Sequence, residues 1–318
     1  MNPELSDDAV EFGRVVREAI GAAGGDALLQ QAEAEPSSRA KAEPLLADLG
    51  LWDLDVRGGG TELEAAACAC RGAGYWGLPY PVAERLARPR DLDVDALAVI
   101  DSTRPLGVAA WLDLRWATVT LAGTRSLGVP RTDPQTPVRY SGFACEFDVD
   151  YADQRGASDV AYALTLPCFT LLGMLDRALE TARAHVLVRE QFGQPLAKFQ
   201  GVQFQLVDAE VERAGVEILG KYALWSAGSG RPEAAQDALA FRLAAVEAAE
   251  IVLRNSQQVQ GATGLCDESV VSWLSRYSQP LRRLPFGVSA TRERLASSLD
   301  RDGLVGLYSP STAGVPHD

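Results

Sequence analysis

Residues 188–200, VREQFGQPLAKFQ, bring a cation, an amide and an aromatic ring together beside a glycine. Arg189, Gln191, Phe192 and Gly193 follow one helical run, and a second amphipathic run comes after them. The stretch predicts one of two structures. It is either a helix–turn–helix of a bundle, with Arg189 as a solvated cation stabilised by the helix dipole, or a surface that binds a cofactor. If it binds a cofactor, the rest of the chain should carry the catalytic groups that this cofactor needs.

Other reactive side chains are scarce. Only two histidines occur: His185 lies in a helical run, and His317 lies next to the C-terminus. This count argues against a histidine-based triad or metal site. The five cysteines are scattered and form no Cys-x-x-Cys pair, so we expect reduced thiols, with neither a disulfide framework nor a zinc site.

The chain is acidic, with a formal net charge of -13 over 318 residues and a pI near 4.7. This charge disfavours nucleic-acid binding, because a phosphate backbone requires a clustered basic surface. The sequence starts with no basic region followed by an apolar one, and it contains no run of about 18 uncharged apolar residues. We therefore expect a soluble, cytoplasmic protein with no membrane partner.

The order of helical and extended patterns predicts a mainly α protein with a small β domain. Apolar residues repeat at helical spacing in three early runs, at 5–23, 37–56 and 61–76. In the second run we expect a helix that stops at Gly50 and is followed by a short extended piece. These runs indicate a helical N-terminal domain over residues 1–90. Short runs rich in β-branched and aromatic residues follow, and they predict a small antiparallel β domain over residues 91–155.

The C-terminal part has helical periodicity again and predicts an antiparallel four- or five-helix bundle over residues 156–305. Its first long helix is expected from residue 157, and further helices are expected at 196–227, 234–261, 267–277 and 289–299. Pro167 implies a kink or a helix start in the first of them. Phe199 and Phe204 are expected in the bundle core, and residues 306–318 are expected to form a loose tail.

This order of domains, with REQFGQPLAKFQ at the first hairpin of the bundle, resembles the acyl-CoA dehydrogenase family. The specific element is Arg-x-Gln-Phe-Gly-x-Pro followed by Phe-Gln, which is represented here by Arg189, Gln191, Phe192, Gly193, Pro195, Phe199 and Gln200. The segment QQVQGATGLCDE occupies the place of the family's Gln-x-x-Gly-Gly-x-Gly stretch. The early segment LLADLGLWDLDVRGGGTELE is similar to the family's N-terminal Leu-Gly-Leu and Gly-Gly pattern.

The resemblance implies an FAD cofactor that lies across a subunit interface. Arg189 would present its guanidinium to the pyrophosphate of an FAD held by the neighbouring subunit, because a planar cation suits two adjacent phosphate groups. Gln191 would bond ribityl or phosphate oxygens, and Phe192 would pack against the adenosine side. Gly193 would allow the sharp turn that ends the helix.

The second segment would contact the same dinucleotide. Gln258 would contribute its side-chain amide, unless it is an ordinary amide on a helix surface. Gly261 and Gly264 would permit close approach of the backbone to the cofactor. Ala262 replaces one glycine of the family pattern.

The catalytic carboxylate of the family is missing at both of its usual positions. The family reaction removes a proton from the α-carbon of an acyl-CoA thioester, which requires a carboxylate in a dry pocket. One position aligns with Pro285 in RLPFGV, and the other aligns near Ala163 in VAYALTL. We therefore assign no catalytic residue, and Asp159 and Glu268 remain the candidates for a displaced base.

The β region is shorter than that of the family, and the stretches that hold the flavin ring and seat the thioester are not visible. This combination resembles the short subunits of actinobacterial heteromeric acyl-CoA dehydrogenases, which form α2β2 tetramers with a longer homologous subunit and act on CoA thioesters of steroid side chains. The resemblance implies a shared FAD, an acyl-CoA substrate and an electron-transfer flavoprotein as acceptor. Two alternatives remain: a self-sufficient homo-oligomeric enzyme, and a flavin-free scaffold subunit.

Overall fold

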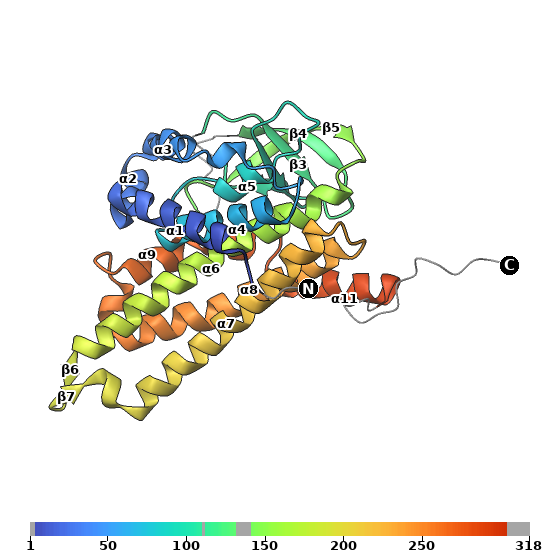
Figure 1. The fold of residues 1–318 in the computed structure, drawn as a ribbon. Helices are drawn as coiled ribbons and strands as arrows, with labels where there is room; N and C mark the ends of the chain where they lie inside the picture. Colours follow the sequence, from blue (N-terminus) through green and yellow to red (C-terminus); the bar gives the residue numbers. More distant parts are fainter. Residues whose placement is uncertain (1–3, 110–111, 132–140, 304–318) are drawn as a thin grey trace.

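The computed structural model describes residues 4–109, 112–131 and 141–303, in which an N-terminal helical region and a small sheet pack against a bundle of long helices (Figure 1). The elements of the N-terminal region, where η marks a 3-10 helix, are α1 (Asp7–Ala22), α2 (Asp26–Ala34), η1 (Pro36–Lys41), α3 (Ala42–Asp48), η2 (Leu51–Asp53), α4 (Gly60–Tyr75) and α5 (Val82–Leu86). The helices predicted at 5–23 and 61–76 are confirmed as α1 and α4.

The predicted end of the second helix at Gly50 is confirmed, because α3 ends at Asp48 and Gly50 takes a left-handed conformation with φ 70°. The first part of this run differs from the prediction, since it forms the 3-10 helix η1. The piece after Gly50, predicted to be extended, begins with the 3-10 helix η2. Helix α2 was also not predicted, because Gly24 and Gly25 end α1 and the chain resumes a helix directly after them.

Helices α4 and α6 (Ala157–Val188) cross at a point where each supplies a glycine. A Cβ atom at Gly74 would lie 1.9 Å from the backbone oxygen of Thr170, and one at Gly173 would lie 1.9 Å from the backbone oxygen of Arg71. No side chain fits at these separations, so the two backbones are in direct contact. This crossing fixes the N-terminal region onto the bundle.

The small domain is a five-stranded sheet in the order β1-β3-β4-β5-β2. Its strands are β1 (Ala96–Val99), β2 (Leu106–Gly107), β3 (Trp116–Val119), β4 (Arg125–Arg131) and β5 (Cys145–Asp153). The prediction of an antiparallel sheet is wrong at one pair, because β1 and β3 are parallel while the other pairs are antiparallel. After β1 the chain crosses to β2 at the opposite edge and returns to β3 in the direction of β1. Trp116 and Phe147 form the centre of the small core of this sheet.

The bundle consists of α6, α7 (Gln200–Gly228) and α8 (Ala234–Gln260), followed by the shorter helices α9 (Val270–Tyr277), α10 (Gln279–Arg283) and α11 (Val288–Asp302). Helix α6 continues through Pro167. It is long and apolar enough to cross a membrane, but 78% of its most apolar window is buried inside the protein. It is therefore the central core helix, with α4 on one side and α7 and α8 on the other (Figure 1). The predicted tail at 306–318 lies outside the described residues.

Candidate functional site

The REQFG motif forms a β-hairpin at the tip of the bundle, between α6 and α7 (Figure 1). Strands β6 (Glu190–Gln191) and β7 (Gln194–Pro195) pair so that the two turn residues are Phe192 and Gly193. Both have positive φ, 52° and 79°, as a type I′ turn requires. Gly193 therefore closes a hairpin, and the expectation that it ends the helix is wrong. Helix α6 already ends at Val188.

The side chains of this hairpin point away from the rest of the chain. Phe192 is 93% exposed, and its only ring partner among the described residues is Phe199, at a centroid distance of 6.3 Å. Arg189 and Gln191 are exposed as well. The Arg189 guanidinium makes no hydrogen bond or ion pair with any residue that the structure describes. An exposed ring, amide and unpaired cation are thus held on a hydrogen-bonded hairpin and are free to contact a ligand from outside the chain.

The second predicted segment lies at the end of α8 and in the 3-10 helix η4 (Gly261–Leu265). Gln258 is exposed. Gly261 ends α8 with φ 64°, and nothing lies within 4 Å of the position that its Cβ would take. Gly264 is different, because it is buried and its Cβ would lie 2.6 Å from the backbone oxygen of Gln257. The structure therefore gives Gly264 a role in packing η4 onto α8.

The two segments meet at the same end of the bundle. A separate apolar cluster joins the last turns of α6 and α8 to the start of α7; its members are Ala182, Val186, Leu196, Ala197, Val202, Leu206 and Val259. Val186 is one turn before Arg189, and Val259 is adjacent to Gln258. The structure thus brings together the predicted residues Arg189, Gln191, Phe192 and Gln258, together with Gly261, at one exposed tip.

The prediction that Phe204 belongs to the bundle core is wrong, and Phe199 is only half-buried. Phe204 is 58% exposed and begins a line of exposed apolar residues on α7, which we call the α7 stripe: Phe204, Val207, Val211 and Ile218. Their spacing of three, four and seven residues places them on one face of the helix. This face begins next to the hairpin and continues along the bundle.

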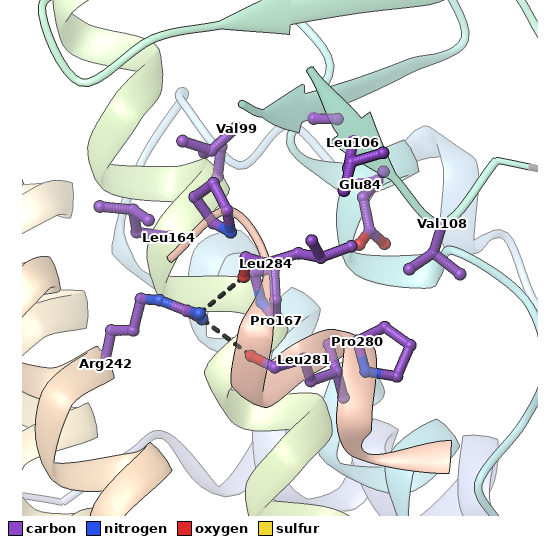
Figure 2. A pocket seen from close by; sticks show the side chains of 14 residues that line it. Glu84, Val99, Leu106, Val108, Leu164, Pro167, Arg242, Pro280, Leu281 and Leu284 are labelled. Carbon is purple, nitrogen blue, oxygen red and sulfur yellow. Dashed lines mark hydrogen bonds between the residues drawn. The ribbon is translucent and has the colours of Figure 1, made fainter. Parts of the chain in front are cut away.

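A second region of interest is a small, partly open cavity of about 50 Å³ between the sheet, α6 and α10 (Figure 2). Ala163 and Pro285, the residues expected from the sequence near the family's two base positions, both line it. Arg242, itself buried, donates hydrogen bonds to the backbone oxygens of Leu281 (3.0 Å), Leu284 (2.6 Å) and Phe286 (2.9 Å). These bonds hold the wall of the cavity that follows α10.

A carboxylate that the sequence did not reveal lies in this cavity. Glu84 on α5 points into it and faces Leu284 (Figure 2). Burial raises the pKa of Glu84 to about 7, and Arg39 offsets only a part of this effect. The signal in the sequence is weak: Glu84 is one acidic residue in the short run VAERL, and nothing in the spacing places α5 beside residues 163 and 285.

The two candidates for a displaced base do not lie there. Asp159 is buried and accepts hydrogen bonds from Arg57 (2.7 Å) and Arg125 (3.4 Å). Arg125 is also paired with Asp91 and Asp153, so Asp159 belongs to an ion network that joins the N-terminal region, the sheet and α6. Glu268 is exposed, in the connection between η4 and α9.

Comparison with known proteins identifies the C-terminal half. Residues 165–292 match the family model described as acyl-CoA dehydrogenase, C-terminal domain. The 3-sulfinopropanoyl-CoA desulfinase of Cupriavidus necator is 32% identical over 123 residues, which amount to 39% of this chain and 28% of that protein. The match thus spans less than a third of the length of this curated relative.

Solved structures extend the similarity of fold over nearly the whole chain. A variant of the Tcur3481-Tcur3483 steroid ACAD superposes with a TM-score of 0.75 at 18% identity, covering 93% of this chain and 98% of that one. The ChsE4-ChsE5 complex from Mycobacterium tuberculosis gives a TM-score of 0.71 at 18% identity, covering 98% and 100%. Residues 165–292 are thus similar to the C-terminal domain of acyl-CoA dehydrogenases, and nearly the whole chain has the fold of these solved structures. Another structure of this fold, with a TM-score of 0.65 at 15% identity, is the FAD complex of PigA.

The described residues fit one part of an FAD site and not another. The hairpin offers the exposed cation, amide and ring that a dinucleotide can contact from outside. The cavity beside Glu84 is too small for a flavin ring: it has about 50 Å³, whereas a cavity that holds a single benzene ring has about 150 Å³. No flavin-ring site is therefore formed around this cavity by the residues that the structure describes.

Proposed function

We propose that this chain is a subunit of a heteromeric, FAD-dependent acyl-CoA dehydrogenase and that it completes the FAD site of a longer, homologous partner. Arg189 would bind the pyrophosphate, with Gln191 and Gln258 as amide donors and Phe192 as the apolar contact. Gly261 would allow close approach of the backbone, whereas the buried Gly264 would support η4. The observation that carries the proposal is the exposed Arg189, which has no ion-pair partner among the described residues, at the base of the β6–β7 hairpin.

The position of Arg189 argues that the flavin belongs to another chain. An α-helix rises about 1.5 Å per residue, so Ala163 in the cavity and Val188 before the hairpin are roughly 37 Å apart along α6. A dinucleotide that contacts Arg189 cannot reach across this distance into the chain's own cavity. We therefore propose that its flavin ring lies in the pocket of a second subunit.

The α7 stripe gives this second subunit a surface to bind. Monomeric proteins rarely expose a continuous apolar patch without using it. Val207, Val211 and Ile218 are 57%, 64% and 66% exposed, and the stripe starts beside the hairpin. A partner that covers the stripe would bring its flavin to Arg189. We propose an α2β2 arrangement with this partner.

The partner would supply the catalytic carboxylate and the pocket in which FAD accepts a hydride from the acyl-CoA. The present chain has alanine and proline at the two family base positions, and it has a short sheet. Similarity of fold to the steroid ACAD and to the ChsE4-ChsE5 complex favours a steroid side-chain CoA thioester as the substrate. An electron-transfer flavoprotein would be the electron acceptor, and the complex would be cytoplasmic.

The test is to purify the wild-type chain and each variant together with the longer homologue. The visible flavin absorbance of each complex is then measured. Arg189→Ala should weaken flavin retention about 10- to 100-fold, because it removes a charged hydrogen bond worth about 1.5–3 kcal/mol. Arg183→Ala is the matched control, since Arg183 is also an exposed cation on α6. Stoichiometric flavin on the isolated chain would instead support a self-sufficient enzyme. An intact complex whose flavin content does not respond to Arg189→Ala would support a flavin-free scaffold.

A further inference from the structure

We infer that His185 is a second group that binds the pyrophosphate of the partner's dinucleotide beside Arg189, and that it makes flavin retention depend on pH. The inference rests on the proposed function, because it requires that a partner's dinucleotide reaches the hairpin. It goes further by adding a residue that lies outside the REQFG motif and that controls cofactor binding through its protonation. The two proposals have different readouts, since an arginine stays charged at every pH used for proteins and a histidine does not.

The position of His185 on α6 places it on the same face of the helix as Arg189. The two residues are four positions apart, and residues at this spacing are neighbours on a helix surface, with Cβ atoms about 5–6 Å apart. The helical geometry extends to Arg189, because its backbone amide donates to the backbone oxygen of His185 at 2.9 Å. An imidazole and a guanidinium are therefore side by side at the base of the hairpin.

The ring of His185 is available to a ligand. It is partly buried, and it makes no hydrogen bond or ion pair with any residue that the structure describes. The next residue, Val186, is buried in the apolar cluster that joins the ends of α6 and α8 to the start of α7. His185 therefore lies at the edge of a packed cluster. Its ring offers one N–H donor when neutral and two when protonated.

Two effects favour the neutral form of His185 in the chain by itself. Burial lowers the pKa of His185, and the neighbouring Arg189 lowers it further. Charged groups on the elements packed around this end of α6 do not contribute to the shift; they are Glu190 on β6, Lys198 on η3, Asp208 on α7 and Arg254 on α8. A pyrophosphate acts in the opposite direction, because a negative charge within about 4–6 Å favours the protonated imidazole. Binding of the dinucleotide therefore raises the pKa of His185, and the protein takes up a proton.

This coupling determines the direction of the pH dependence. The protonated imidazole binds the pyrophosphate more tightly than the neutral one, since a hydrogen bond to a charged donor is roughly twice as strong. The additional affinity is fully present below the pKa that His185 has in the free chain. It is lost as the pH rises through the higher pKa that His185 has in the complex. Arg189 stays charged over this range, so its own contribution to binding does not change.

The experiment compares flavin retention by the complex of the full chain with the longer homologue at about pH 6 and about pH 8. Retention is measured from the visible flavin absorbance that remains after dialysis. His185→Gln keeps a neutral donor but cannot be protonated. The ratio of wild-type to His185→Gln retention should therefore be about five- to tenfold larger at the lower pH. His185→Lys is charged at both pH values, so it should retain flavin well at both.

A second measurement follows the protonation of the ring directly. The chain has only two histidines, so the NMR signal of His185 in a selectively labelled chain is assigned by its loss in His185→Gln. The pKa of His185 should be higher in the flavin-containing complex than in the isolated chain.

The controls separate this inference from the proposed function. Arg183→Ala, which changes another exposed cation on α6, should leave the pH dependence as it is in the wild type. Arg189→Ala should weaken flavin retention at both pH values. If it does so while His185→Gln changes retention equally at both pH values, or while the pKa of His185 is the same with and without the partner's flavin, the role of His185 is overturned and that of Arg189 stands. If neither Arg189→Ala nor His185→Gln changes retention, both proposals are overturned.

Discussion

Replacing Glu84 by glutamine is expected to stabilise the folded chain at pH 8 by roughly 2–3 kcal/mol. Glutamine has the same size and carries no charge. The pKa of Glu84 is raised from 4.5 to about 7, so ionisation of the wild-type carboxyl group lowers the free energy of unfolding at high pH. The difference is about 2.5 pKa units, and at about 1.36 kcal/mol per unit it corresponds to roughly 3.4 kcal/mol. Water in the partly open cavity reduces this upper value.

The sign follows from the proton balance of the two states. Below pH 4.5 Glu84 is protonated in both the folded and the unfolded chain, so its ionisation does not change the free energy of unfolding. Between pH 4.5 and 7 the unfolded chain loses the proton first, so the stability of the wild-type fold decreases as the pH rises. Above pH 7 both states are ionised and the loss is complete. The glutamine variant does not titrate at this position, so its advantage grows over the same range.

Urea denaturation monitored by circular dichroism, at steps from pH 5 to pH 8, measures this difference. The free energy of unfolding of the variant minus that of the wild type should increase by roughly 1 kcal/mol per pH unit up to about pH 7 and then remain level. Glu268→Gln serves as the control and should give a flat difference. A Glu84→Gln difference that does not change with pH, or one that favours the wild type at pH 8, would refute the assignment of Glu84 as a largely desolvated carboxylate with no ion-pair partner among the described residues.

Three further changes test the fold and the interface. Gly173→Ala should lower the free energy of unfolding by about 3 kcal/mol, measured with urea, because its Cβ would overlap the backbone oxygen of Arg71; a loss below 1 kcal/mol would contradict the contact between α4 and α6. Asp159→Asn should cost about 2–3 kcal/mol at pH 7 in the same assay, since it breaks a buried pair with Arg125 that joins three regions; unchanged activity per folded molecule would rule it out as a base. Val211→Glu should leave the chain's own stability within about 0.5 kcal/mol and weaken partner binding at least tenfold, as seen by size-exclusion chromatography; undiminished binding would place the interface elsewhere.

The elements that the sequence predicted well are those whose own pattern decides their structure. Helices α1, α4, α7 and α8 carry long apolar repeats with clear ends, and they form where the repeats lie. The motif was predicted correctly to lie between the first two helices of the bundle. That it forms a β-hairpin was not predicted. The turn depends on Phe192 taking a positive φ, which is unusual for an aromatic residue and which local preference does not predict.

The features that could not be predicted depend on contacts between distant segments. The parallel pairing of β1 with β3 follows from the route of the chain through β2, and no strand pattern records that route. Gly264 looked like a residue that gives a ligand access, and its buried contact with Gln257 is visible only when η4 folds back onto α8. Glu84 was missed for the same reason, because its environment is built by α6 and the segment around α10.

The separation of the two sites along α6 leads to a last prediction. Sites that are farther apart than about 10 Å and share no partners have additive effects. The double variant Arg189→Ala, Glu84→Gln should therefore retain flavin as poorly as Arg189→Ala alone, and the pH dependence of its free energy of unfolding should match that of Glu84→Gln alone. Measuring both quantities separates the two assignments, because each readout depends on one residue. If Arg189→Ala also changed the pH dependence of stability, the hairpin and the cavity would have to be coupled through α6.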